Sequence, residues 1–119
     1  MKKILIVDDS PAQIALMKAV LDKAGYWSVS ISDARRLEQT VEVERPNLIL
    51  MDVVMPGRNG FQACRELKDH SEFGRIPVLL VTSKNTSSDK FWAQQQGADG
   101  YVVKPFTPDE LLGAVQRWV

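Results

Sequence analysis

Two runs of four consecutive apolar residues, each followed directly by aspartate, constrain the fold of this chain more than any other feature. Ile4-Leu5-Ile6-Val7 precedes Asp8 and Asp9, and Leu48-Ile49-Leu50-Met51 precedes Asp52. An apolar run without alternation cannot present one face to water, so each run predicts a strand that is covered on both faces. Such strands are typical of a parallel sheet with helices on both sides, and these sheets bind ligands at the carboxyl ends of their strands.

Two later segments repeat this arrangement with different polar residues. Val78–Val81 leads into Thr82-Ser83, and Tyr101-Val102-Val103 leads into Lys104-Pro105. Segments with helical spacing and capping signals lie between the expected strands, and we count five strands and five helices without internal repeats or a linker. This alternation predicts an α/β fold built from stacked βαβ units around a parallel sheet.

Several local signals give expectations about single elements. Ser10-Pro11-Ala12-Gln13 predicts a helix start with a capping serine, proline at the first helical position and glutamine at the capping-box position. Alternation over Trp27–Ile31 predicts an edge strand, and Asp33 is expected to cap the second helix. The fourth helix is expected over Phe91–Gln96, after a polar loop. Three further side chains are expected in the core or at its edge, Cys64, Trp92 and Trp118, with a docking surface as the alternative for Trp92.

Length and composition restrict the classes of function. A chain of 119 residues has the size of one ordinary domain, so we expect a single domain over residues 1–119 and no second domain. The 15 basic and 15 acidic residues balance, which argues against nucleic acid or an anionic membrane as a partner. Asp8 and Asp9 interrupt the first apolar run too early for a signal peptide or a membrane span. The lone Cys64 excludes an internal disulfide, and together these features predict a cytoplasmic protein.

The polar residues at the strand ends predict a metal and phosphoryl site. Right-handed crossovers place the loops after parallel strands at one edge of the sheet, so Asp8, Asp9 and Asp52 are expected to converge there. Three converging carboxylates repel one another, and Mg²⁺, or Mn²⁺ as the alternative, relieves this repulsion while leaving room for phosphate oxygens. Lys104 and Thr82 supply a positive charge and a hydroxyl that suit a phosphoryl group in transfer. An aspartate can itself be the nucleophile and form an acyl phosphate.

Each of these residues also has an ordinary structural explanation. Acids between a strand and a helix often serve only as helix caps, which applies to Asp8 and Asp9. Thr82 and Ser83 could satisfy backbone groups of their own loop. Tyr101 could be a half-buried strand aromatic with its hydroxyl in water. The functional interpretation depends on the whole set occurring together in one chain.

The motifs that carry these residues resemble one protein family. Five segments match it in order and spacing: Ile6–Ser10, Leu50-Met51-Asp52, Met55–Gly60, Val81-Thr82-Ser83 and Gly97–Phe106. They span nearly the whole chain and resemble the receiver domain of bacterial two-component response regulators, the family that includes the chemotaxis response regulator. The resemblance implies a flavodoxin-like, doubly wound sheet in the order 2-1-3-4-5, with two helices on one face and three on the other. Because the length leaves no room for a second domain, we expect a stand-alone receiver without an output domain.

The resemblance assigns roles to the strand-end residues. Asp52 matches the aspartate that accepts the phosphoryl group, and Asp9 matches the direct metal ligand. By the same resemblance, Asp8 acts mainly through a metal-bound water, and the backbone carbonyl of Val54 gives a further metal contact. Lys104 matches the lysine that pairs with the phosphoryl oxygens.

A switch is also implied by the resemblance. Thr82 matches the hydroxyl that moves to the phosphoryl group, Tyr101 matches the aromatic that rotates inward, and Ser83 is a small neighbour that leaves room. The new charge on Asp52 shifts the population of two arrangements, and the fourth helix, fifth strand and fifth helix report the shift to a downstream protein target. The implied donor is a sensor histidine kinase or a phosphotransfer protein. Pro105 is expected to follow a cis peptide bond in this family.

Two positions that vary within the family line the route to the phosphoryl group. Val54 and Lys84 stand where the chemotaxis regulator carries polar or acidic residues, so they are expected to shield the acyl phosphate from water differently. We predict a changed lifetime of the acyl phosphate and leave its direction open. Lys84 together with Asp89-Lys90-Phe91-Trp92 also resembles the receivers of type IV pilus or twitching-motility pathways.

Three hypotheses about function follow. The first is a phosphorylation-dependent interaction switch in motility, taxis or pilus control, which catalyses only its own phosphorylation and dephosphorylation and acts as an effector or a phosphate sink. The second is a Mg²⁺-dependent aspartate-nucleophile phosphatase, disfavoured because Val54 occupies the position where that superfamily has a second acid. The third is an orphan receiver that binds partners without phosphorylation, disfavoured because clustered unpaired charge is costly to retain.

Overall fold

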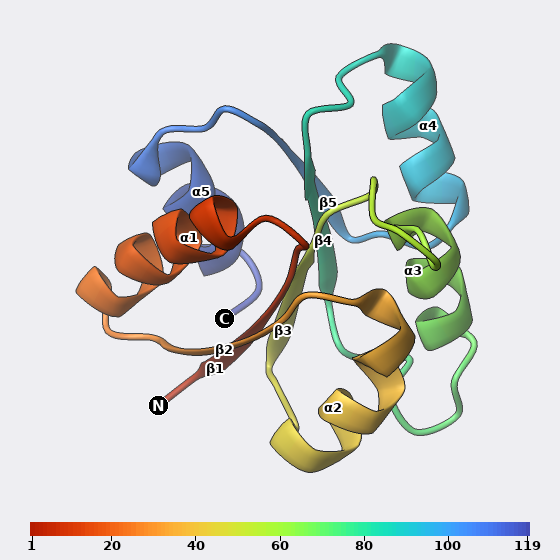
Figure 1. Cartoon of the computed structure of the whole chain (residues 1–119), viewed down its shortest axis with the longest axis horizontal. Helices are drawn as coiled ribbons and strands as arrows, with labels where there is room; N and C mark the ends of the chain where they lie inside the picture. The colour runs from red at the N-terminus through yellow and green to blue at the C-terminus, as the bar shows by residue number, and fades with distance from the viewer.

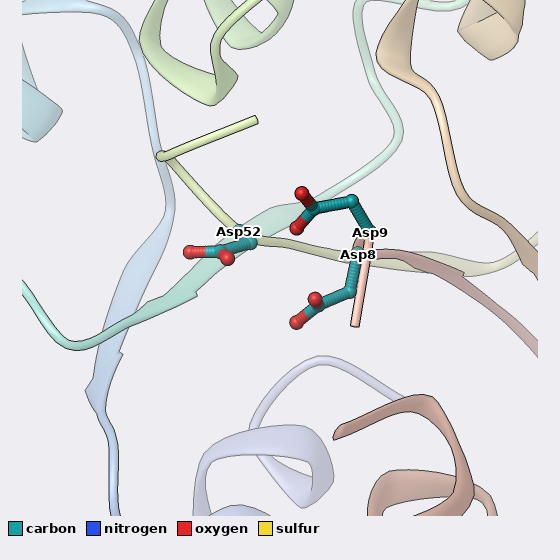
Figure 2. A group of neighbouring side chains, drawn as sticks. All are labelled: Asp8, Asp9 and Asp52. Atoms are coloured by element: carbon teal, nitrogen blue, oxygen red, sulfur yellow. The ribbon is translucent and has the colours of Figure 1, made fainter. Parts of the chain in front are cut away.

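Five parallel strands form a sheet at the centre of the computed structural model, which describes residues 1–119 (Figure 1). The strands are β1 (Lys3–Val7), β2 (Trp27–Ile31), β3 (Leu48–Met51), β4 (Val78–Thr82) and β5 (Gly100–Val103). Their order is β2-β1-β3-β4-β5, which confirms the order predicted from the family resemblance. In the register of the sheet Val7 lies beside Met51, so the residues that follow, Asp8 and Asp52, leave the sheet next to each other (Figure 2).

Helices cover both faces of the sheet in the predicted numbers. Two of them, α1 (Pro11–Lys23) and α5 (Pro108–Gln116), lie together on one face (Figure 1). The other face carries α2 (Leu37–Glu44), α3 (Gly60–Lys68) and α4 (Ser87–Gln95), and a short 3₁₀ helix, η1 (Ala34–Arg36), precedes α2. None of these helices is both long enough and apolar enough to span a membrane.

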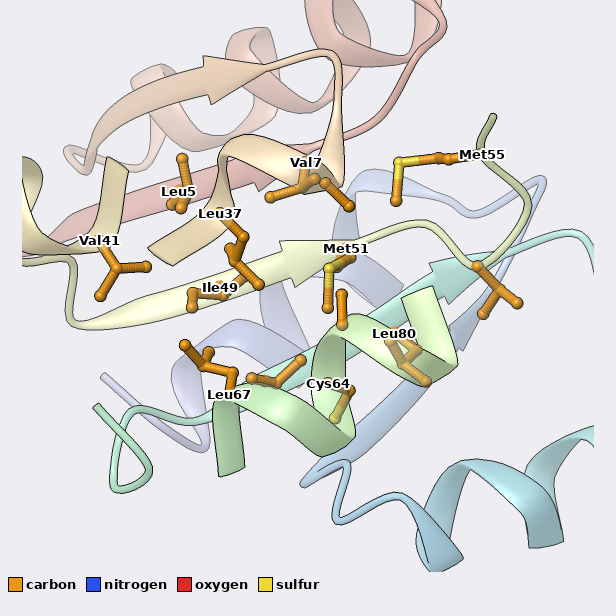
Figure 3. Packing of buried hydrophobic residues seen from close by; sticks show 14 of the residues in the cluster. Leu5, Val7, Leu37, Val41, Ile49, Met51, Met55, Cys64, Leu67 and Leu80 are labelled. Carbon is orange, nitrogen blue, oxygen red and sulfur yellow. The ribbon is translucent and has the colours of Figure 1, made fainter. Parts of the chain in front are cut away.

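The two central strands explain the continuous apolar runs of the sequence. Leu5 and Ile49 point into the cluster beneath α2 and α3, to which Leu67 also belongs (Figure 3). Their neighbours Ile6 and Leu50 point into the opposite cluster, beneath α1 and α5. All residues of the two runs are fully buried, so no position along them tolerates a polar side chain. Full burial of an aliphatic side chain of this size contributes about 1.5–3 kcal/mol, which fixes both strands in the middle of the sheet.

The start of α1 differs from the sequence prediction in one respect. The Ser10 hydroxyl accepts a hydrogen bond from the Gln13 amide at 3.3 Å, and Pro11 occupies the first helical position, as expected. The capping box is nevertheless incomplete, because the Ser10 amide donates to the Asp8 carboxylate at 2.9 Å and is not available to Gln13. The Gln13 amide oxygen has no hydrogen-bond partner. Asp8 therefore accepts the hydrogen bond from the Ser10 amide that the glutamine side chain accepts in a complete capping box.

Two other helix starts were placed wrongly by the sequence analysis. Asp33 caps η1 through the Arg35 amide, so it lies one short helix before α2. The helix α4 begins at Ser87 and not near Phe91, because Thr86 and Asp89 form a complete capping box. The pattern of a threonine followed three residues later by an acid was present in the sequence and marks such a start.

The tryptophans of the carboxyl-terminal half, which were expected in the core or at its edge, lie at the surface. Trp92 is 52% exposed and Trp118 is 41% exposed. On α4 only Ala93 is buried, since this helix touches the sheet with its smallest side chains and leaves Phe91 and Trp92 in solvent. Trp118 lies beyond the end of α5 at Gln116. Cys64 is buried as predicted, and burial raises the pKa of its thiol to about 11.

Candidate functional site

Three carboxylates converge at the carboxyl edge of the sheet, where the sequence analysis expected them. Asp8 and Asp9 follow β1, Asp52 follows β3, and the three carboxylates lie around the same edge of the sheet (Figure 2). One carboxylate oxygen from each residue lies within 4.8 Å of the others. Asp8 is fully buried, Asp52 is partly buried and Asp9 is exposed, so the cluster forms a shallow site that is open to solvent on the side of Asp9.

Lys104 supplies the positive charge closest to these acids. Its ammonium group donates to Asp8 Oδ2 at 2.6 Å and lies 3.5 Å from Asp52 Oδ2. The Lys104 side chain is only 11% exposed, and the Asp8 side chain 1%, so both charges have lost most of their hydration. A buried charge is tolerated when it is paired and hydrogen-bonded. Lys104 is placed by the adjoining strands, because its own amide donates to the Thr82 carbonyl at 2.9 Å.

The backbone of Asp52 is fixed by hydrogen bonds, and one of its two carboxylate oxygens accepts none from the backbone. The Asp52 amide donates to the Val7 carbonyl at 2.9 Å, which ties it to β1. Its Oδ1 atom accepts a hydrogen bond from the Val53 amide at 2.7 Å, so Oδ2 is the oxygen that faces Lys104. The first residue of α3, Gly60, packs directly against this backbone: a Cβ atom there would lie 2.1 Å from the Asp52 carbonyl oxygen. A glycine is therefore required at this position.

The backbone of Lys84 connects two further residues that the sequence analysis singled out. Its amide donates to the Thr82 hydroxyl at 3.4 Å, and its carbonyl accepts from the Tyr101 hydroxyl at 2.7 Å. Thr82 is fully buried beneath this loop. Burial raises the pKa of Tyr101 to about 12, and the negative charges of Asp89 and Asp52 add to the shift. The two side chains are thus joined through the backbone of one residue, Lys84, in the β4–α4 loop.

The remaining predicted residues lie at the rim of the site. Ser83 is exposed, and the Lys84 ammonium lies 3.9 Å from Asp89 and not against the three acids. Val54 is 59% exposed beside Asp52. The peptide bond between Lys104 and Pro105 is cis. Direct contacts therefore connect Asp8, Asp52 and Lys104 into one cluster with Asp9, while the other residues surround it.

The donor set fits a hard divalent cation. The three residues offer only carboxylate oxygens, which Mg²⁺ and Mn²⁺ prefer over nitrogen or sulfur ligands. The oxygens already lie close enough together to share one ion after small side-chain movements. Three negative charges in one place, with Lys104 in contact with two of them, leave an excess of negative charge that a cation would neutralise.

The sequence analysis missed one residue beside the site. Arg58 lies in the loop between β3 and α3, and its side chain is 13% exposed with carboxylates on both sides. The segment Met55–Gly60 was identified as one of the motifs that resemble the family, but no role was predicted for its arginine. No spacing rule marks an arginine in such a loop as a structural centre, because its partners lie on three different elements, two of them before β3.

Comparison with known proteins decides the family. Residues 4–116 match the response regulator receiver domain family. This chain is a response regulator receiver domain. The match confirms the family that the sequence motifs suggested, and it makes this domain one of the phosphoacceptor signalling proteins, which work with histidine kinases or phosphotransfer proteins and with downstream targets.

Relatives of this receiver domain include short and long proteins. It is 41% identical over 115 residues to Protein PilH of Pseudomonas aeruginosa, with 97% of this chain and 95% of PilH covered. It is 35% identical over 115 residues to the alkaline phosphatase synthesis transcriptional regulatory protein PhoP of Bacillus subtilis, with 97% of this chain but 47% of PhoP covered. The receiver domain thus spans about half the length of that transcriptional regulator and nearly the whole of PilH.

Solved structures share its architecture throughout. The chemotaxis protein CheY4 of Vibrio cholerae superimposes with a TM-score of 0.93 at 32% identity, covering 100% of this chain and 99% of CheY4. The receiver domain of sensor histidine kinase PA1611 from Pseudomonas aeruginosa gives a TM-score of 0.89 at 31% identity, covering 98% of this chain and 96% of that domain. That receiver domain holds a magnesium ion coordinated in its active site cleft.

Proposed function

We propose that Asp52 of this receiver domain accepts a phosphoryl group from a phosphohistidine of a sensor histidine kinase or a phosphotransfer protein. The observation that carries the proposal is the position of Asp52 Oδ2, which faces the Lys104 ammonium at 3.5 Å and lies within the cluster formed with Asp8 and Asp9. A carboxylate so placed can approach a phosphorus atom while the positive charge of Lys104 offsets the negative charge of the phosphoryl oxygens.

The transfer exchanges one bond to phosphorus for another. Asp52 Oδ2 attacks phosphorus, and the phosphorus–nitrogen bond to the donor histidine breaks as the new oxygen–phosphorus bond forms. The imidazole nitrogen keeps the electron pair of the broken bond and takes up a proton from water. The product is an acyl phosphate on Asp52, while Oδ1 keeps its hydrogen bond from the Val53 amide throughout.

Asp8, Asp9, Asp52 and the backbone carbonyl of Val54 are the groups we assign to the metal, for which Mg²⁺ is our proposal and Mn²⁺ the alternative. When bound, the ion supplies positive charge to the phosphoryl oxygens in transfer. The residues of this chain hold the ion and orient the acceptor. Lys104, already paired with Asp8 at 2.6 Å, is near enough to contact a phosphoryl oxygen on Asp52.

The switch that we propose uses the backbone amide and carbonyl of Lys84. A phosphoryl group on Asp52 offers oxygens that attract the Thr82 hydroxyl away from the Lys84 amide, to which it is bonded at 3.4 Å. The loop then changes its arrangement, and Tyr101, bonded to the Lys84 carbonyl, follows it. We assign the resulting docking surface to α4, β5 and α5. The exposed side chains of Phe91 and Trp92 on α4 support this assignment, because exposed aromatic residues are enriched at protein interfaces.

The physiological setting that we propose is motility, taxis or pilus control. The likeness to PilH and to chemotaxis protein CheY4 supports this range. We propose further that the domain acts in the cytoplasm, as a single receiver domain over residues 1–119, and that it hydrolyses its own acyl phosphate. Val54, exposed beside Asp52, and Lys84 are the side chains we expect to set the lifetime of that acyl phosphate.

The test is phosphorylation by a small donor. The purified protein is incubated with acetyl phosphate and Mg²⁺ and analysed by intact mass and peptide mapping. We expect a Mg²⁺-dependent, hydroxylamine-labile phosphoryl adduct on Asp52, absent in Asp52→Asn. Asp22→Asn, which removes an exposed carboxylate on α1, is the matched control and should keep the adduct. No adduct under conditions that phosphorylate another receiver domain, or an adduct that persists in Asp52→Asn, contradicts the proposal.

A further inference from the structure

The loop between β3 and α3 is fastened near its centre by one side chain. Arg58 Nη1 donates to Glu38 Oε1 at 2.7 Å and to the Ala34 carbonyl at 2.9 Å, and its Nη2 donates to Glu38 Oε2 at 2.7 Å. Its Nε donates to Glu66 Oε1 at 3.0 Å. All three nitrogens of the guanidinium are therefore bonded, to partners on η1, α2 and α3.

This arrangement is a strong clamp for three physical reasons. The contact with Glu38 is a two-point fork, the geometry in which arginine binds a carboxylate best. The Arg58 side chain is 13% exposed, so water screens these bonds less than it screens a surface ion pair. The hydrogen bonds from Arg58 also hold the pKa of Glu38 below its usual value, as expected for a carboxylate kept in its charged form by a guanidinium.

The rest of the loop has few restraints of its own. Its ends are tied by backbone bonds, from Asp52 to Val7 at 2.9 Å and from Gly60 to Val53 at 2.8 Å. Between these ends Val54, Pro56 and Gly57 are exposed, and Met55 is the residue that packs into the core. The one backbone bond within this stretch runs from the Arg58 amide to the Pro56 carbonyl, at 3.0 Å. Val54 therefore lies between two buried residues, Val53 and Met55, and Arg58 is the next side chain after Met55 that fastens the loop.

We propose that Arg58 is a positioning residue for the metal site: by binding η1, α2 and α3 together, it holds the β3–α3 loop in the arrangement in which the Val54 carbonyl would serve as a metal ligand. This inference rests on the proposed function, since it concerns the same site. Arg58 touches neither the metal nor the phosphoryl group. Residues that orient metal ligands from behind change metal affinity by about 10–100-fold when they are replaced.

Electrostatics alone predicts the opposite result, which makes the inference testable. Removing a positive charge near an acidic cluster strengthens the attraction of that cluster for a cation. If Arg58 acted only as a distant charge, Arg58→Ala would bind Mg²⁺ more tightly. If Arg58 acts by holding the loop, Arg58→Ala binds Mg²⁺ more weakly in spite of the lost positive charge.

The chain offers a matched control in Arg35. This arginine lies against the same loop, since a Cβ atom on Gly57 would come within 3.0 Å of Arg35 Nε. Its hydrogen bonds nevertheless go to Asp33 in its own turn, and its side chain is 66% exposed. Arg35→Ala therefore removes the same charge from the same region without releasing the loop.

The experiment measures Mg²⁺ binding and loop motion directly. Calorimetric titration with Mg²⁺ should give a dissociation constant about tenfold higher for Arg58→Ala than for the wild type, and within about twofold of the wild type for Arg35→Ala. Amide hydrogen exchange should accelerate over residues 53–58 in Arg58→Ala and stay unchanged in β1 and β4. Arg58→Lys keeps the charge but not the fork, so its affinity for Mg²⁺ should lie between those of the wild type and Arg58→Ala.

An unchanged or lower dissociation constant for folded Arg58→Ala would overturn the inference. If Arg58→Ala does not fold, Glu38→Gln is measured in the same way, because it keeps Arg58 and weakens only the fork; an unchanged dissociation constant in that variant overturns the inference equally. The phosphorylation of Asp52 and the positioning role of Arg58 are contradicted by different results. A wild-type protein that binds Mg²⁺ but forms no adduct on Asp52 contradicts the proposed function and leaves the Arg58 measurements valid.

Discussion

Lys104 is the residue on which the electrostatics of the site depend most. It contacts Asp8 at 2.6 Å and Asp52 at 3.5 Å, and it is nearly buried with them. Asp8 is fully buried, so without Lys104 its carboxylate would have only the Ser10 amide as a hydrogen-bond donor in the metal-free protein. A carboxylate in that position is poorly compensated, and a bound cation is the natural substitute for the lost ammonium group.

We expect Lys104→Ala to lower the free energy of unfolding by about 1–3 kcal/mol in the absence of divalent cations, because the buried Asp8 carboxylate loses its charged partner. Mg²⁺ should remove much of this difference. Acyl phosphate should still form on Asp52, since Lys104 is not the nucleophile, but the change in the α4–β5–α5 surface should be weakened. Urea unfolding in EDTA and in Mg²⁺ measures the first effect. Equal stability of variant and wild type in both solutions would show that Asp8 does not need the ammonium group.

Sequence reasoning at this scale worked where the chemistry was local. Asp8, Asp9 and Asp52 could be grouped because each directly follows an apolar run, and parallel strands bring such positions together. Arg58 could not be found in this way. Its partners Glu38 and Glu66 are 20 residues before it and 8 residues after it, and only the packing of α2 beside α3 makes them neighbours.

Among the elements, the β4–α4 loop connects the site with the surface. The Lys84 backbone is bonded to the Thr82 hydroxyl through its amide and to the Tyr101 hydroxyl through its carbonyl, so a movement of the loop affects both side chains. The pKa of Tyr101 is raised from 10.0 to about 12, mainly because the ring is partly buried in β5. The folded state therefore favours the neutral phenol, which is also the form that donates to the Lys84 carbonyl.

This pKa gives a pH dependence with a definite sign. The contribution of a neutral Tyr101 to stability is fully present below pH 10.0, the value for an unfolded chain, and is lost as the pH rises toward about 12. Tyr101→Phe should be less stable than the wild type by about 1 kcal/mol near neutral pH, where the hydrogen bond is intact. The difference in free energy of unfolding between the wild type and this variant should narrow above about pH 10. Urea unfolding followed by tryptophan fluorescence measures this difference. A difference that stays constant across this pH range contradicts a stabilising role of the neutral Tyr101 hydroxyl.

How far an element is buried determined whether it was predicted correctly from the sequence. The strands β1 and β3 were predicted correctly because both of their faces are covered, which leaves an unmistakable apolar run. The helix α4 was predicted too short, and Trp92 was expected in the core or at its edge, whereas only Ala93 is buried and the aromatic residues face solvent. A helix with so small an apolar face gives little periodicity, and its capping box was the better signal.

At the scale of the whole molecule, the register of the sheet assembles the site. Val7 pairs with Met51 and Thr82 pairs with Val103, so the residues after four strands open onto one edge. Periodicity predicted the strands and helices, but the strand order came from the family resemblance, because apolar patterns do not specify which strands are neighbours. The cluster of acids is therefore a product of long-range pairing, and a cation that binds it stabilises the entire fold.

Millimolar Mg²⁺ should raise the thermal unfolding midpoint of the protein, since only the folded chain brings the three acids together. Binding at about one hundred times the dissociation constant contributes about 2.7 kcal/mol. Asp9→Asn removes a ligand that is exposed and makes no structural hydrogen bond, so this variant should fold normally and lose most of the Mg²⁺ response. Differential scanning calorimetry with and without Mg²⁺ checks this. Asp22→Asn should respond like the wild type, and an undiminished response in Asp9→Asn would place the cation elsewhere.

The position of Lys104 after the last strand has a consequence for the protein as it is made. The ribosome releases Asp8, Asp9 and Asp52 into solution long before it synthesises the lysine that pairs with two of them. Lys104 reaches its place only when β5 has joined β4, which is the last pairing of the sheet to become available during translation. A growing chain thus holds the three carboxylates without the ammonium group that pairs with two of them, and it depends on cations from solution to offset their repulsion until synthesis has passed the fifth strand.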